Sequence, residues 1–96
     1  MIIYKKSLDL SLYLVLDPSF ISTSNYESVL SEALKAGVNV VQLREKNCSN
    51  EEFFNLAQKI SHFLKNTSIP FIINDRIDIA KKVNADGVHL GQYALS

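Results

Sequence analysis

Several residue types that specialise a protein are scarce in this chain of 96 residues. It contains one cysteine, Cys48, which excludes an internal disulfide and with it the disulfide framework of small secreted domains. Its ten basic and ten acidic residues give no net charge, which argues against a broad nucleic-acid-binding surface. The apolar runs are too short to span a bilayer, and the first residues lack the hydrophobic core of a signal peptide. We therefore expect a cytoplasmic protein with no nucleic-acid or membrane partner.

Glycine and proline, with three and two copies, are scarce as well, and each stands at an expected element boundary. Between these boundaries, short continuous apolar runs are typical of strands that are buried on both faces. The runs lie at residues 12–16, 38–43, 71–73 and 87–90. Apolar residues at helical spacing predict helices over residues 26–36 and from about residue 50 to residue 66, and a shorter helix beyond residue 75.

Residues at the helix boundaries support this assignment. Gly37 follows the first helix and predicts its end, because glycine adopts the left-handed conformation without steric cost. Ser49 and Glu52 have the spacing of a capping box at the start of the second helix. Asn74 or Asp75 is expected to cap the short third helix.

The resulting element order is β-α-β-α-β-α-β. Such alternation implies an α/β fold, in which right-handed helical crossovers join parallel strands. Two architectures are compatible with this order, an open doubly wound sheet and part of a barrel. The sequence contains neither the G-x-G-x-x-G nucleotide fingerprint nor a P-loop that would favour one of them.

Polar residues follow two successive predicted strands, at the edge where parallel α/β sheets bind their ligands. Gln42, Arg44 and Lys46 have the same parity, so on an extended backbone they project to one side. An amide, a guanidinium and an ammonium together suit a phosphorylated ligand that is rich in heteroatoms. Asp75 adds a hard carboxylate of the kind that binds Mg²⁺ together with substrate phosphates. The residues alone equally allow a solvated strand end at 44–46 and a simple helix cap at Asp75.

Three segments, in order along the chain, carry a family resemblance. Residues 41–46 read VQLREK, residues 73–80 read INDRIDIA, and residues 85–92 read ADGVHLGQ. Each resembles a signature of the thiamine phosphate synthases, and the similarity runs from about residue 13 to residue 92. The resemblance implies a TIM (β/α)₈ barrel rather than an open sheet. Residues 1–96 would then form the N-terminal half of that domain, with about four βα units.

The resemblance also implies an activity. Thiamine phosphate synthases are transferases that join hydroxymethylpyrimidine diphosphate to a thiazole phosphate and release pyrophosphate. It further assigns roles to residues of this chain. Arg44 and Lys46 would be catalytic, because they stabilise the negative charge that grows on the leaving pyrophosphate. Asp75 would bind Mg²⁺. The residues implied to bind the pyrimidine diphosphate are Gln42, Leu43, Arg44, Glu45, Lys46 and Asn74.

Two features depart from the family pattern. Ala94 stands where the family has an aspartate that is a second magnesium ligand, and the chain stops at Ser96, far short of a full barrel. A half barrel is expected to leave one sheet face bare and apolar, so we expect self-association or a complementing C-terminal half. The alternatives are a non-catalytic remnant that binds a phosphorylated ligand and a protein similar to thiazole tautomerases. His89, between two apolar residues, is expected only to pack within its strand.

Overall fold

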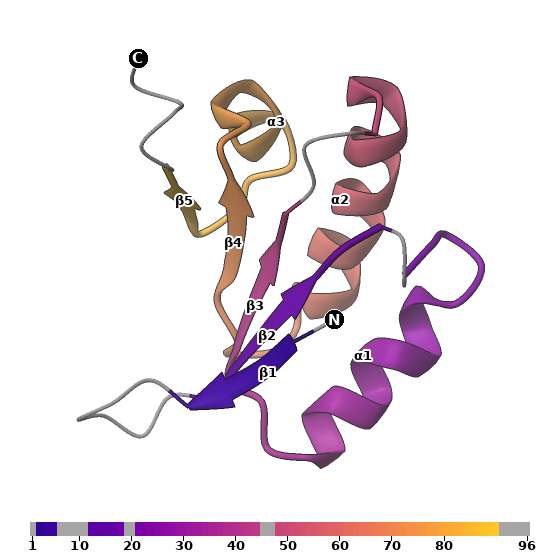
Figure 1. The fold of residues 1–96 in the computed structure, drawn as a ribbon, viewed down its shortest axis with the longest axis vertical. Coiled ribbons are helices and arrows are strands. Elements are labelled where there is room, and N and C mark those ends of the chain that lie inside the picture. Colours follow the sequence, from indigo (N-terminus) through magenta and orange to yellow (C-terminus); the bar gives the residue numbers. More distant parts are fainter. Residues whose placement is uncertain (1, 6–11, 19–20, 45–47, 91–96) are drawn as a thin grey trace.

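The computed structural model describes residues 2–5, 12–18, 21–44 and 48–90, and it confirms the predicted α/β alternation (Figure 1). Each predicted strand and helix is present, with its ends shifted by a few residues at most. The elements are β1 (Ile2–Lys5), β2 (Leu12–Leu16), α1 (Tyr26–Lys35), β3 (Val40–Leu43), α2 (Asn50–Leu64), β4 (Phe71–Asn74), α3 (Ile77–Lys82) and β5 (Gly87–His89).

The strands form one sheet in the sequential order β1-β2-β3-β4-β5, in which β2 to β5 are parallel. A doubly wound sheet would reverse its strand order and place helices on both faces. A sequential order with right-handed crossovers instead puts every connecting helix on the same face, as in a barrel. The chain therefore has the winding of the first four strands of a (β/α)₈ barrel, as the resemblance implied.

Strand β1 was not expected from the sequence. It pairs antiparallel with β2, with Ile3 opposite Leu14 and Lys5 opposite Leu12 (Figure 1). The backbone of β2 is therefore bonded on both sides, by β1 and by β3. Only the parallel part of the sheet follows the barrel pattern, and β1 extends it at the N-terminal side.

The two faces of the parallel sheet differ in chemistry. On one face, alternate residues of β2, β3 and β4 belong to the apolar core that α1, α2 and α3 cover. These strand residues are Leu14, Leu16, Val41, Leu43, Phe71 and Ile73, all buried. The other face of these strands carries six residues, of which three are half-buried and three are buried. The half-buried ones are Tyr13, Val40 and Ile72, and the buried ones are Val15, Gln42 and Asn74. The expected apolar second face is interrupted at its carboxyl edge, where two bonded amides lie.

The helix ends confirm two of the three boundary predictions. Ser49 Oγ accepts a hydrogen bond from the Glu52 backbone N–H at 3.1 Å, as a capping box requires. Gly37 has φ +95°, and the N–H of the next residue, Val38, donates to the Ala33 carbonyl oxygen, so α1 ends in a Schellman motif. The third prediction was wrong. The N-cap position of α3 is occupied by Arg76, whose own side chain makes no capping hydrogen bond.

None of the helices in the described part of the chain has the length and apolar character needed to cross a membrane. The longest of them, α2, buries five side chains on one face and exposes charged residues on the other. This amphipathic pattern is that of a helix packed on a sheet.

Candidate functional site

A hydrogen-bonded pair of amides lies at the carboxyl edge of the sheet. Gln42, on β3, is 9% exposed, and Asn74, the last residue of β4, is 7% exposed. The Gln42 Nε2 donates to Asn74 Oδ1 at 3.2 Å. Among the described residues, Gln42 and Asn74 are the two polar ones that are buried. Buried amides in proteins are almost always hydrogen-bonded, because an unpaired one destabilises the fold. This pair therefore belongs to the folded structure of the sheet face turned away from the helices, which we call the inner face.

His89, on β5, extends the network by one strand. Its Nδ1 lies 2.8 Å from Asn74 Oδ1. A carbonyl oxygen accepts but never donates, so Nδ1 must carry the proton and the Nε2 of the neutral ring is left as an acceptor. The side chain is exposed, so the expectation that His89 only packs was wrong. The sheet register gives the signal for this contact, since Asn74 and His89 are paired residues on adjacent strands.

Asp75 follows Asn74 in a strained backbone conformation. Its φ is +65°, and the Arg76 N–H donates to the Asn74 carbonyl oxygen at 2.9 Å, across Asp75. This is a γ-turn with positive φ at its centre, a rare and strained form. The Asp75 Oδ2 accepts from Asn74 Nδ2 at 2.9 Å, which brings the carboxylate into the amide network. Strain of this kind is concentrated at functional sites.

The segment after β3 is described only in part. Leu43 is fully buried in the core beneath the helices, so its side chain does not reach the inner face. Arg44 is exposed, and its backbone N–H continues the sheet by donating to the Leu16 carbonyl oxygen at 2.9 Å. Glu45 and Lys46 lie outside the described residues. The structure thus brings together Gln42, Asn74 and Asp75 and leaves the arginine accessible at the same edge.

The described residues contain no cluster of three or more histidine, cysteine, aspartate or glutamate side chains that could hold a metal ion. Asp75 borders a hollow of about 700 Å³ between the start of α2 and α3. A site with one carboxylate suits Mg²⁺ in particular, since this ion keeps several waters and takes its remaining ligands from substrate phosphates. The donor set therefore fits a magnesium ion brought with a phosphorylated ligand. Ala94, at the expected second ligand position, lies outside the described residues.

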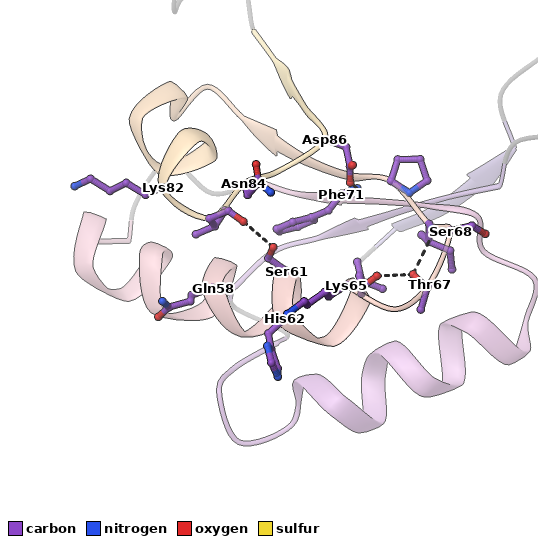
Figure 2. Close-up of a pocket in the computed structure, with 14 residues that line it drawn as sticks. Gln58, Ser61, His62, Lys65, Thr67, Ser68, Phe71, Lys82, Asn84 and Asp86 are labelled. Atoms are coloured by element: carbon purple, nitrogen blue, oxygen red, sulfur yellow. Dashed lines mark hydrogen bonds between the residues drawn. The ribbon is translucent and has the colours of Figure 1, made fainter.

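A second hollow, of about 610 Å³, lies at the opposite end of the sheet, where β4 and β5 begin (Figure 2). Three of its polar side chains, those of Ser61, Thr67 and Asp86, bond within the chain. Ser61 Oγ donates to the Val83 carbonyl oxygen at 2.7 Å, and an Asp86 carboxylate oxygen accepts from the Phe71 N–H at 2.7 Å. These bonds tie α2, α3 and the sheet together. In barrels this end serves stability, whereas ligands bind at the carboxyl ends of the strands.

Fold and site together define the class of protein. It is an α/β chain of barrel type with a hydrogen-bonded polar cluster at the carboxyl edge of its strands, where proteins of this fold bind ligands. A model of the family described as thiamine monophosphate synthase matches residues 12–96. The chain belongs to this family, which confirms the resemblance seen in the sequence.

Individual relatives support the same assignment. The thiamine-phosphate synthase of Clostridium tetani is 47% identical over 92 residues, which cover 96% of this chain and 44% of the relative. That of Campylobacter jejuni serotype O:2 is 49% identical over 91 residues, 95% of this chain and 43% of the relative. That of Methanobrevibacter smithii is 50% identical over 86 residues, 90% of this chain and 41% of the relative. The chain spans less than half the length of these curated relatives.

Backbone strain at Asp75 can be measured with two substitutions that both remove the carboxylate. We expect Asp75→Gly to be more stable than Asp75→Ala by about 1 kcal/mol, because only glycine adopts φ +65° without steric cost. Urea denaturation of the two variants gives the difference. The same pair at Asp78, in the first turn of α3, is the control and should show the opposite order, because glycine weakens a helix. Equal stability of the two variants at residue 75 would show that the γ-turn is unstrained.

Proposed function

We propose that this chain provides the pyrimidine-diphosphate half of a thiamine phosphate synthase. The observation that carries the proposal is the amide network of Gln42, Asn74 and His89 beside the Asp75 carboxylate, at the edge where barrels bind substrates. Family membership agrees with it. The proposed substrates are hydroxymethylpyrimidine diphosphate and a thiazole phosphate. A cytoplasmic location belongs to the same proposal, since a single cysteine fits a reducing compartment.

In the proposed reaction, the bond between the pyrimidine methylene carbon and the diphosphate oxygen breaks first, and the electron pair leaves with pyrophosphate. The ring nitrogen of the thiazole phosphate then forms the new carbon–nitrogen bond with its lone pair. This chemistry needs neither a nucleophilic side chain nor a general base. It needs positive charge where negative charge develops, and the cations after β3, Arg44 and Lys46, are proposed to supply it.

The amides and the carboxylate have binding roles in this proposal. Gln42 and Asn74 would position the heteroatoms of the pyrimidine diphosphate, since amide groups both donate and accept hydrogen bonds. The backbone at Leu43 and the residue Glu45 complete the proposed binding segment. Asp75 would hold Mg²⁺, which would neutralise part of the charge on the leaving pyrophosphate.

A chimaera tests the activity. It joins residues 1–90 of this chain to the part of the Clostridium tetani relative that lies beyond the equivalent position. We expect the purified chimaera to form thiamine phosphate from the two substrates. Arg44→Ala is expected to lower kcat/KM by roughly 10²-fold, because it removes charge from the leaving group.

Lys65→Ala is the control for that variant. Lys65 is an exposed cation at the opposite end of the sheet, so its loss should leave the rate unchanged. A second chimaera with its junction after Ser96 keeps Ala94, and comparison with its Ala94→Asp variant measures what the missing carboxylate contributes. Absence of product from both folded chimaeras, even with Ala94→Asp, would refute the proposed activity.

Asp75→Asn in the chimaera tests the metal role separately from the fold. Asparagine tolerates the left-handed conformation, so the turn at Asp75 should survive. We expect the Mg²⁺ concentration for half-maximal rate to rise by about tenfold, in line with the loss of a charged ligand. Asp78→Asn, an exposed carboxylate three residues away, is the matched control. An unchanged Mg²⁺ dependence for Asp75→Asn would remove Asp75 from the metal site.

The open edge of the sheet supports a further proposal, that another half barrel covers it. Within the described chain, β5 pairs with β4 alone, and Val88 and Leu90 are 38% and 39% exposed. Exposed apolar residues on a free strand edge favour association. We propose that the strands present in the longer relatives, beyond the matched region, are the natural occupant.

The 96-residue chain alone is expected to use a second copy instead, so light scattering at micromolar concentration should give a mass above the 10.8 kDa of the monomer. Val88→Lys should shift the chain toward monomer, because a charge on the edge opposes pairing. Ile77→Lys is the control, since Ile77 is 45% exposed but lies on α3 rather than on the edge strand. A folded wild-type monomer at this concentration would contradict the expectation.

A further inference from the structure

Arg76 follows the proposed metal-binding Asp75, but its side chain is directed away from the amide network. It lies over the Phe53 ring of α2, with the guanidinium carbon 4.3 Å from the ring centre. Phe53 is fully buried and Arg76 is half-buried, so the guanidinium stacks on a core residue at the boundary between the core and solvent. Its position is therefore fixed by packing as well as by charge.

The same guanidinium bonds the chain just before α2. One terminal nitrogen, Nη2, donates to the Cys48 carbonyl oxygen at 3.0 Å. The other, Nη1, donates to the Ser49 carbonyl oxygen at 3.3 Å and to Asn50 Oδ1 at 3.0 Å. These acceptors, three neighbouring oxygens in the described part of the chain, are two carbonyl groups and a side-chain amide. A rigid planar fork can satisfy such a set simultaneously, whereas the single ammonium of lysine cannot match its geometry.

These bonds fix one end of the connection between β3 and α2. The other end is fixed at Arg44, whose backbone N–H donates to the Leu16 carbonyl oxygen. The segment between them is short, since β3 ends at Leu43 and α2 begins at Asn50. Of this connection the described residues are Arg44, Cys48 and Ser49, and Arg76 holds the last two beside α2.

The backbone joins this clamp to the carboxylate side of the site. Arg76 and Asp75 are consecutive, and the strained γ-turn at Asp75 sends their side chains in different directions. The Asp75 carboxylate bonds Asn74 on the inner face, while the Arg76 fork bonds the connection beside α2. One turn thus joins the carboxylate on the inner face to the residue that holds Cys48 and Ser49 beside α2.

We propose that Arg76 is a positioning residue of the diphosphate site, holding Cys48 and Ser49, at the start of α2, in a fixed position relative to Asp75. The inference rests on the proposed function, because it assigns Arg76 a role in that same site. It predicts that loss of the guanidinium fork weakens diphosphate binding although Arg76 does not touch the ligand.

The first measurement reads the connection directly. Cys48 is the single cysteine of the chain and is half-buried, so the rate at which a disulfide reagent modifies its thiol reports opening of the connection. Arg76→Lys is expected to raise this rate by about fivefold while keeping the charge. Asn50→Ala, which removes one acceptor and keeps the arginine, should give a smaller increase. Lys81→Gln, which removes an exposed charge from α3, should give none.

The second measurement gives the affinity of the site for pyrophosphate. Calorimetric titration of the wild-type chain with inorganic pyrophosphate in the presence of MgCl₂ is expected to show binding, and Arg76→Lys is expected to raise the Kd by about tenfold. Both measurements are made under conditions in which urea curves show every variant to be folded, so that loss of fold cannot imitate the effect.

The outcomes separate the two proposals. An unchanged Cys48 rate in Arg76→Lys overturns the positioning role. A raised Cys48 rate with an unchanged Kd, where Arg44→Ala does weaken binding, shows that Arg76 serves the fold alone, and the inference fails while the proposed function stands. A wild-type chain that does not bind pyrophosphate with magnesium overturns the inference, whereas the proposed function is overturned only if the chimaeras also form no product.

Discussion

The orientation of the Asn74 side-chain amide is the constraint on which the rest of the site depends. Its Nδ2 donates to the Asp75 carboxylate, which can only accept, so Oδ1 must point the other way. There Oδ1 accepts hydrogen bonds from Gln42 Nε2 and His89 Nδ1. These bonds fix the orientation of the Gln42 amide and the tautomer of the His89 imidazole. A single carboxylate thus orders polar groups on β3, β4 and β5. Because these bonds cross strands, they exist only in the observed register.

The strand register also decides which residues face the helix-covered core and which face the polar site. A shift of one residue would turn Asn74 toward the helices and bring Ile73 to the inner face. The apolar residues that pack beneath α1, α2 and α3 make this slip costly, since each buried aliphatic side chain contributes about 1.5–3 kcal/mol. The helix-covered core therefore holds the inner-face amides in place. Fold and site are specified by alternate residues of the same strands.

Local patterns in the sequence were sufficient for most of the fold. The apolar runs gave β2 to β5, and Gly37 and Ser49 gave two helix boundaries, because each signal lies within a few residues of the feature it determines. Strand β1 was missed because its short apolar stretch is not bounded by glycine or proline, and only pairing with β2 identifies it. The position of the ligand edge could also be predicted, since it follows from parallel strands alone.

What could not be predicted depends on contacts between distant segments. His89 looked like a packing residue because its sequence neighbours are apolar, whereas its partner Asn74 is fifteen residues away. Asp75 looked like a helix cap because aspartate before a helix usually is one, yet its backbone takes φ +65° and α3 begins without a side-chain cap. Both errors have the same origin. Propensity describes a residue by its sequence neighbours, and these two are placed by hydrogen bonds to other strands.

The strained backbone at Asp75 places the side chains of Asp75 and Arg76 on different sides of the sheet. On a regular strand the Asp75 side chain would point away from Asn74, toward the helix-covered face. The γ-turn allows the Asp75 carboxylate to bond Asn74 on the inner face while the Arg76 guanidinium stacks on Phe53 beside α2. The turn is held by the bond from the Asp75 N–H to the His89 carbonyl oxygen at 2.8 Å, so β5 is required for it as well. A relaxed backbone at residue 75 would lose this separation, which is why a site with so few charged groups retains a strained one at its centre.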